Sequence, residues 1–213
     1  MNLPGIAYVD IASNLLPLGI GVARIRSIRR ERWYFFLFVA AAAITELVTY
    51  WMATQRIHNL WLLQWYNIIE YGSLILLFAA WQKNAIIRKS LIWSNAVFLV
   101  LWVWFKVTGI EKLTDPAEYT HTISSVTLVI ASLIALVDLM KEETSSIYRE
   151  ARFWISSSVL IYFAGNIILF LFSTSLSALN LQAFSRFGTL HWGIDIACNF
   201  MYAIAFLCFP KNP

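Results

Sequence analysis

Residues 33–53 read WYFFLFVAAAAITELVTYWMA, with Glu46 as the single charged residue of the run. About 20 such residues in a helix, rising ~1.5 Å each, cross the ~30 Å hydrocarbon core of a bilayer. Runs of the same kind occupy residues 5–23, 60–81, 90–108, 119–140, 153–172 and 188–209. The sequence therefore predicts an all-α polytopic membrane protein, with seven transmembrane helices forming a single domain over residues 1–213.

The composition leaves little room for anything besides these spans. Hydrophobic residues make up 60% of the 213 residues and charged residues 13%, against roughly a quarter in soluble domains. We therefore expect short loops and no separate soluble domain. The excess of basic residues follows the loops, so we interpret it as a topology signal and expect no nucleic-acid partner.

Basic residues are unevenly divided between the two sides of the predicted spans. Four lie on one side, at Arg56, Lys106, Lys112 and Arg186. The other twelve are Arg24, Arg26, Arg29, Arg30, Arg32, Lys83, Arg88, Lys89, Lys141, Arg149, Arg152 and Lys211. Because loops rich in Lys and Arg stay in the cytoplasm, the sequence predicts an outer N-terminus and an inner C-terminus.

Spans one to three and five to seven carry similar short motifs. Glu46 follows Arg32 by 14 residues, and Asn166 follows Arg152 by the same interval. Residues 11–13 and 130–132 both read IAS. These matches favour a 3+1+3 arrangement of two parallel repeats.

The last predicted outer loop, residues 173–187, is the longest. Hydrophobic residues recur in it at helical spacing, at Leu176, Leu179, Ala183, Phe184 and Phe187. This pattern predicts a short helix lying at the membrane surface, with a lid over an outer pocket as the alternative.

Polar side chains lie inside the predicted spans, where an ionisable group costs at least ~2.5 kcal/mol on insertion scales. They are Asp10, Glu46, Asn67, Glu70, Asn166, His191, Asp195 and Asn199. Most lie ~9–15 Å from the predicted outer ends, although neighbouring spans run in opposite directions. We therefore expect these residues to converge in the outer half of the membrane and to bind a ligand.

Helical spacing places several of these side chains on common faces. His191, Asp195 and Asn199 follow one another at intervals of four, and Asn67 and Glu70 are three apart. Such faces predict an outward-facing acidic pocket without a lysine or arginine at its depth. A proton, a metal ion, a cationic ligand or water would have to balance the carboxylates. Bridging between helices is the structural alternative for the asparagines, at ~0.6 kcal/mol per hydrogen bond.

A metal ion is one alternative occupant, held by His191 and Asp195 with Glu46 or Glu70. Hydrolytic zinc sites usually contain more imidazoles than this pattern offers, which disfavours catalysis. Retinal is excluded by the seventh span, because no lysine lies between Lys141 and Lys211 to carry it. We expect no other cofactor.

The run LWLLQWYNIIEY at residues 60–71 is accompanied by Glu46 before Asn59-Leu60-Trp61, and by Asn199 and Tyr202 in the last span. In these features the chain resembles a family of small, uncharacterised seven-span integral membrane proteins of Bacteroidota. The resemblance implies seven helices in a bacterial cytoplasmic (inner) membrane, and it implies no activity.

Three functions stay open on these observations. The first is recognition of a small polar or cationic ligand, or of protons, by a sensor or accessory subunit that signals through a partner protein. The second is a small secondary transporter that uses Glu46, Glu70 and Asp195 for coupling. The third is a metal-dependent intramembrane hydrolase.

Overall fold

The computed structural model describes residues 5–25, 31–114, 117–142, 146–177 and 181–209, and side chains outside 168–187. Within these ranges the chain forms helices, turns and loops, with no strand. The α-helices are α1 (Gly5–Ala23), α2 (Arg32–Thr54), α3 (Leu60–Trp81), α4 (Ala85–Val107), α5 (Glu118–Met140), α6 (Ala151–Ser177) and α7 (Leu181–Cys208). A short 3-10 helix, η2 (Ile147–Arg149), precedes α6. The prediction of an all-α polytopic membrane protein is confirmed.

The apolar content of these helices fits the bilayer. Among the described residues, α1 to α5 and the part of α7 from Gly188 are long and apolar enough to cross a membrane. The predicted bounds agree closely for α1, α2, α3 and α5. The prediction for α4 starts too late, because Asn84 caps the helix by accepting hydrogen bonds from the N–H groups of Ile86 and Ile87, at 2.8 and 3.4 Å.

The separate surface helix predicted for residues 173–187 is wrong. Described residues of this stretch continue α6 to Ser177 and begin α7 at Leu181. Of the apolar positions behind this prediction, Leu176 falls in α6 and the last three, Ala183, Phe184 and Phe187, fall in α7, while Leu179 lies outside the described residues. The same periodicity therefore extends the two flanking helices.

The chain divides into two compact units. The terminal unit comprises Met1–Ser27 and Ser132–Pro213, and the central unit comprises Ile28–Ala131. α5 contributes its first part to the central unit and its last part to the terminal unit.

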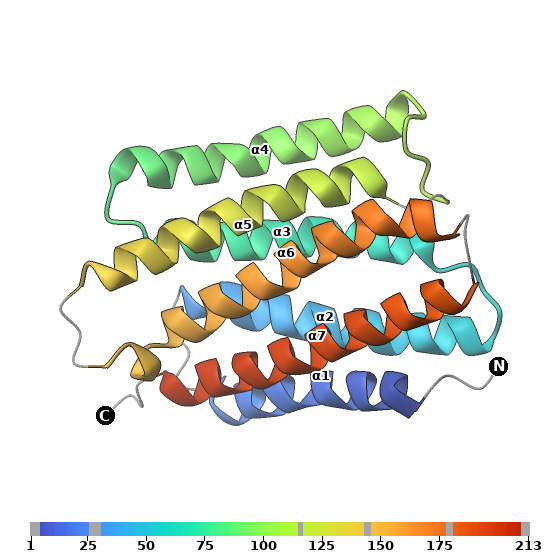
Figure 1. Ribbon diagram of the computed structural model, residues 1–213. Coiled ribbons are helices and arrows are strands. Elements are labelled where there is room, and N and C mark those ends of the chain that lie inside the picture. The colour runs from blue at the N-terminus through green and yellow to red at the C-terminus, as the bar shows by residue number, and fades with distance from the viewer. Residues whose placement is uncertain (1–4, 26–30, 115–116, 143–145, 178–180, 210–213) are drawn as a thin grey trace. The chain divides into compact units, whose positions relative to one another are not determined.

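In the terminal unit, α7 packs against both α1 and α6 (Figure 1). Arg24, directly after α1, donates from Nη1 to the carbonyl oxygens of Phe206, Leu207 and Phe209, at 3.1, 2.9 and 3.3 Å. This guanidinium satisfies carbonyls at the C-terminal end of α7, where a helix lacks its own donors. It therefore ties the end of α1 to the end of α7.

In the central unit, α3 packs against α2 and α4 (Figure 1). The rings of Tyr71 and Phe98 lie 4.2 Å apart between centroids, and the Tyr71 hydroxyl donates to Ser94 Oγ at 3.0 Å. α4 leaves a long face uncovered by the protein, including Trp93, Val100 and Val107. An uncovered apolar face of this kind is what lipid contact requires.

Candidate functional site

The eight polar residues predicted to bind a ligand divide between the two units. The terminal unit holds Asp10, Asn166, His191, Asp195 and Asn199, and the central unit holds Glu46, Asn67 and Glu70. Each unit brings some of its own members together. Convergence of all eight on one pocket stays a prediction.

The clearest cluster joins α6 and α7 in the terminal unit, and we name Asn166, His191 and Asp195 the α6–α7 polar site. His191 Nδ1 lies 2.9 Å from Asn166 Oδ1, and His191 Nε2 lies 3.3 Å from Asp195 Oδ2. The Asn166 side chain is buried, whereas the side chains of His191 and Asp195 are 39% and 17% exposed. The imidazole therefore sits between an amide and a carboxylate, and part of its surface is exposed.

A close approach of the two helices produces this contact. A Cβ atom added at Gly165 would lie 2.9 Å from Ile194 Cδ1, so glycine leaves space for the α7 side chain. Asn166 and Asp195 directly follow these two residues in their helices. The Tyr162 ring lies one turn away on α6, 6.3 Å from the His191 ring between centroids.

The hydrogen-bonding capacity of His191 makes this geometry chemically informative. A neutral imidazole has one N–H, but here both ring nitrogens face oxygen atoms, Asn166 Oδ1 and Asp195 Oδ2. An imidazolium donates from both nitrogens and also carries a positive charge next to the Asp195 carboxylate. The arrangement can therefore bind a proton and balance a carboxylate within the span.

Asn199 lies further along α7 and bonds to a different helix. Its Nδ2 donates to Ser13 Oγ of α1 at 2.9 Å, and Ser13 Oγ donates to the Asp10 carbonyl oxygen at 2.7 Å. Asn14 Nδ2 also lies 3.4 Å from that carbonyl oxygen. Asn199 thus bridges α1 and α7, which is the structural alternative for asparagines inside spans.

In the central unit, Glu70 is 3% exposed and accepts a hydrogen bond from the Tyr66 hydroxyl at Oε1, at 3.1 Å. Asn67 accepts at Oδ1 from Ser124 Oγ of α5, at 3.0 Å. The two side chains that were predicted to share a face of α3 therefore have different partners. Glu46 of α2 is half-buried, and within the described ranges it makes no hydrogen bond or ion pair.

Neither unit assembles a metal-binding cluster from its described residues. No group of three or more His, Cys, Asp or Glu side chains there is placed to hold one ion. His191 and Asp195 are adjacent, as their spacing predicts. The completion of a metal site by Glu46 or Glu70 stays a prediction.

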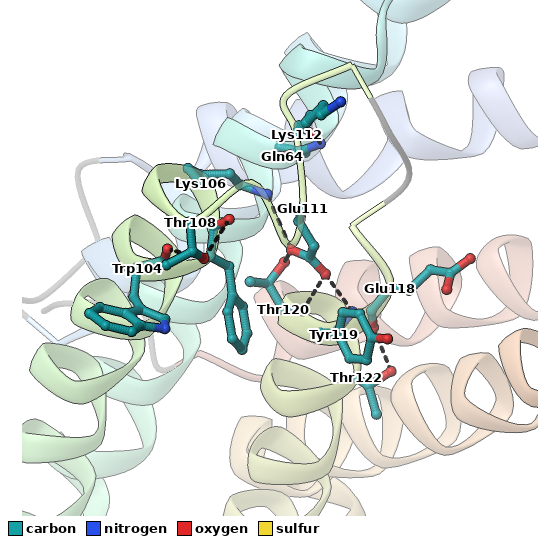
Figure 2. Close-up of polar contacts among 11 residues, drawn as sticks. Gln64, Trp104, Lys106, Thr108, Glu111, Lys112, Glu118, Tyr119, Thr120 and Thr122 are labelled. Carbon is teal, nitrogen blue, oxygen red and sulfur yellow. Dashed lines mark hydrogen bonds and ion pairs between the residues drawn. The ribbon is translucent and has the colours of Figure 1, made fainter.

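Sequence reasoning missed a well-connected acidic residue, Glu111, in the segment between α4 and α5 (Figure 2). Its Oε2 lies 3.1 Å from Lys106 Nζ and accepts from Thr120 Oγ1 at 2.8 Å. Its Oε1 accepts from the backbone N–H groups of Tyr119 and, at 3.0 Å, Thr120. The signal was present as an acidic residue between Lys106 and Lys112, two lysines that were interpreted only as markers of topology.

Comparisons with known proteins add no relative to this geometry. No family model matches the chain, and neither a curated protein nor a solved structure matches it. Membership of the seven-span family from Bacteroidota therefore stays a prediction.

Proposed function

We propose that this integral membrane protein binds a proton at the α6–α7 polar site and acts as a sensor or accessory subunit. The supporting observation is the imidazole of His191, whose two nitrogens both face oxygen atoms. In a neutral ring, one of these nitrogens carries no proton, so two hydrogen-bond acceptors face each other. Binding of one proton turns that nitrogen into a donor. Among the ligands that the sequence left open, this geometry fits the proton best.

The surroundings of His191 support a proton as occupant. In the described part of the chain, Asp195 contacts the ring from α7, and Tyr162 lies beside it on α6. α1 also packs against α7, and there the backbone carbonyl oxygen of Asp10 accepts from Ser13, which accepts from Asn199, eight residues beyond His191. An ionised Asp195 inside a span needs a nearby positive charge, and protonated His191 supplies one.

We propose that movement of α6 and α7 relative to each other transmits the signal from the polar site. Gly165 allows α6 and α7 to approach closely at the polar site, so gain or loss of the proton changes the force between the two helices at their contact. The segments between the helices are short, and we therefore propose a separate partner protein as the receiver. In keeping with the predicted outer N-terminus, we propose that the site lies in the outer half of a bacterial cytoplasmic membrane.

Magnetic resonance of the imidazoles in lipid nanodiscs tests the proposal. The chain has three histidines, and His191→Gln identifies the signals of His191 by their loss. We expect both ring nitrogens of His191 to carry protons at the acidic end of a pH titration, and one of them to lose its proton as the pH rises. Asp195→Asn should weaken this form, whereas His58→Gln, at an exposed position, should leave it unchanged.

One result would overturn the proposal. If Asn166 instead turns its amide nitrogen toward the ring, a neutral His191 satisfies both contacts. The His191 nitrogens would then keep one tautomer across the titration. This arrangement would also give a partner to Asn166 Nδ2, which has none among the described residues.

Proton- or cation-coupled transport is the second candidate, and Glu70 favours it. This carboxylate is buried on α3, and no ion pair with a basic residue is found for it in the described part. Carboxylates in that position commonly carry coupling ions. Substrate flux in proteoliposomes that disappears in Glu70→Gln would support transport, and it would contradict the sensor proposal.

A further inference from the structure

The connection between α4 and α5 in the central unit is held by one carboxylate. Glu111 is 3% exposed and receives four polar contacts, from Lys106, from the Thr120 hydroxyl, and from the N–H groups of Tyr119 and Thr120 (Figure 2). These donors belong to α4 and α5, whereas Glu111 belongs to neither helix. Both of its oxygens are therefore engaged in joining the two helices.

The contacts with α5 satisfy groups that a helix cannot satisfy alone. The N–H groups of the first turn have no partner within the helix, and a nearby side chain normally accepts from them. Here the acceptor is a residue eight positions before Tyr119. Its negative charge also faces the positive end of the helix dipole, which stabilises the start of α5.

Lys106 completes the arrangement from the last turn of α4. Its side chain is 11% exposed, and Nζ lies 5.4 Å from the centroid of the Trp102 ring. A cation so far removed from water depends on its carboxylate partner and, to a lesser extent, on the aromatic face. Loss of the Glu111 charge would therefore leave both Lys106 and the start of α5 without compensation.

Hydrogen bonds connect this arrangement to the polar residues of α3. Gln64 Nε2 donates to the Lys112 carbonyl oxygen at 2.8 Å, which fixes the segment next to Glu111 (Figure 2). Ser124 lies one turn after Thr120 on α5 and donates to Asn67 Oδ1. The position of Ser124 relative to α3 thus depends on how the first turn of α5 is held.

We propose that Glu111 is a latch that holds the first two turns of α5 against α4 and α3. When the latch is closed, the N–H groups of Tyr119 and Thr120 are bound and Ser124 contacts Asn67. When the Glu111 contacts break, residues 118–124 detach while the rest of the fold persists. The inference concerns the central unit and stands independently of proton binding at the α6–α7 polar site.

Hydrogen–deuterium exchange in nanodiscs tests the latch with Glu111→Gln, which keeps the size of the side chain and removes its charge. The matched control is Glu118→Gln, since Glu118 is an exposed acidic residue in the first turn of the same helix. We expect amide exchange at residues 119–124 to rise ~10-fold or more in Glu111→Gln, as local opening becomes easier. Exchange in α6 and α7 should stay unchanged, and Glu118→Gln should match the wild type throughout.

A second variant keeps the test decisive if Glu111→Gln does not fold. Lys106→Gln keeps the contacts of the Glu111 carboxylate with α5 but removes its cation, so it should raise exchange at the same amides by a smaller factor. Unchanged exchange at residues 119–124 in a folded variant would refute the latch. An equal rise in all helices would also refute it, because Glu111 would then stabilise the fold as a whole.

Discussion

Replacing Arg24 by alanine tests how the terminal unit is closed at the end of α7. Arg24 Nη1 contacts three carbonyl oxygens, those of Phe206, Leu207 and Phe209. The guanidinium reaches them across more than 180 positions of sequence, from the end of α1. Arg24→Ala removes every one of these contacts and leaves the backbone of α1 intact.

The expected loss of stability follows from the geometry of the donor. Nη1 carries two protons, so it supports at most about two full hydrogen bonds among three acceptors, each contributing ~1.5–3 kcal/mol as a charged pair. Arg24 is only half-buried, and carbonyls released at a helix end can turn to water. Because water weakens these bonds and replaces them when they are lost, we expect Arg24→Ala to lower the free energy of unfolding by about 1–2 kcal/mol.

A thiol-reactive dye provides the assay, because the chain has two cysteines with different accessibility. Cys198 is buried on α7 and reacts after unfolding, whereas Cys208 is half-buried and is replaced by serine in all samples. For a chain of this length each kcal/mol corresponds to ~2–4 °C, so Tm should fall by about 2–8 °C. Arg24→Lys keeps a positive charge at the end of α7 and should lose about half as much.

Arg88→Ala is the matched control, since Arg88 is exposed in the first turns of α4 and its side chain bonds to no carbonyl oxygen of the described residues. Its Tm should stay at the wild-type value. If Arg24→Ala melts at the same temperature as Arg88→Ala, the three hydrogen bonds contribute nothing measurable. The view that Arg24 fastens α1 to α7 would then be wrong.

Two further predictions concern contacts inside the terminal unit. Asn199→Ala should lower the free energy of unfolding, measured by thermal unfolding, by only ~0.6 kcal/mol, because Ser13 keeps its bond to the Asp10 carbonyl oxygen. A loss of several kcal/mol would show that Asn199 does more than bridge helices. Gly165→Ala should change stability by less than about 1 kcal/mol, because the near atom is the mobile end of Ile194 and alanine favours the helix. Gly165→Val should cost ~1–3 kcal/mol, because the larger side chain overpacks the contact between α6 and α7. Equal melting temperatures for the alanine and valine variants would contradict a close approach of these two helices.

The spans could be predicted from the sequence because hydrophobic length alone decides them. α1 and α3 have the predicted bounds, since turn residues and charges end each run at the point where the helix ends. α4 differs because Arg88 and Lys89 were counted as loop residues, although the Asn84 cap extends the helix over them. Charge marks the limit of the apolar region, whereas caps mark the limit of the helix.

Contacts within one helix were easier to predict than contacts between helices. The spacing of four placed His191 beside Asp195, and the structure has them adjacent. The same stripe was expected to include Asn199, which instead bonds to Ser13 on α1. The contact between Asn166 and His191 depends on how α6 and α7 are aligned along each other, and a single sequence carries no information on that alignment.

Glu111 was overlooked for a related physical reason. Two of its partners are backbone N–H groups, which every residue possesses, so no residue type marks them in the sequence. Lys106 was visible but was interpreted only through its effect on topology. Remote capping of a helix by a carboxylate from the preceding segment becomes evident only when the fold of that segment is known.

Three carboxylates, those of Glu111, Glu70 and Asp195, differ in the groups that compensate their charge. Glu111, between two helices, has a lysine and three further donors, so folding alone accounts for its charge. Glu70 lies within a span, where it accepts from the Tyr66 hydroxyl and forms no ion pair with a basic residue of the described part. Asp195 lies within a span beside an imidazole that becomes a counter-charge only when protonated. Since a carboxylate within the membrane is costly, we expect binding of a proton or another cation to change the energy of the protein more at Glu70 and Asp195 than at Glu111.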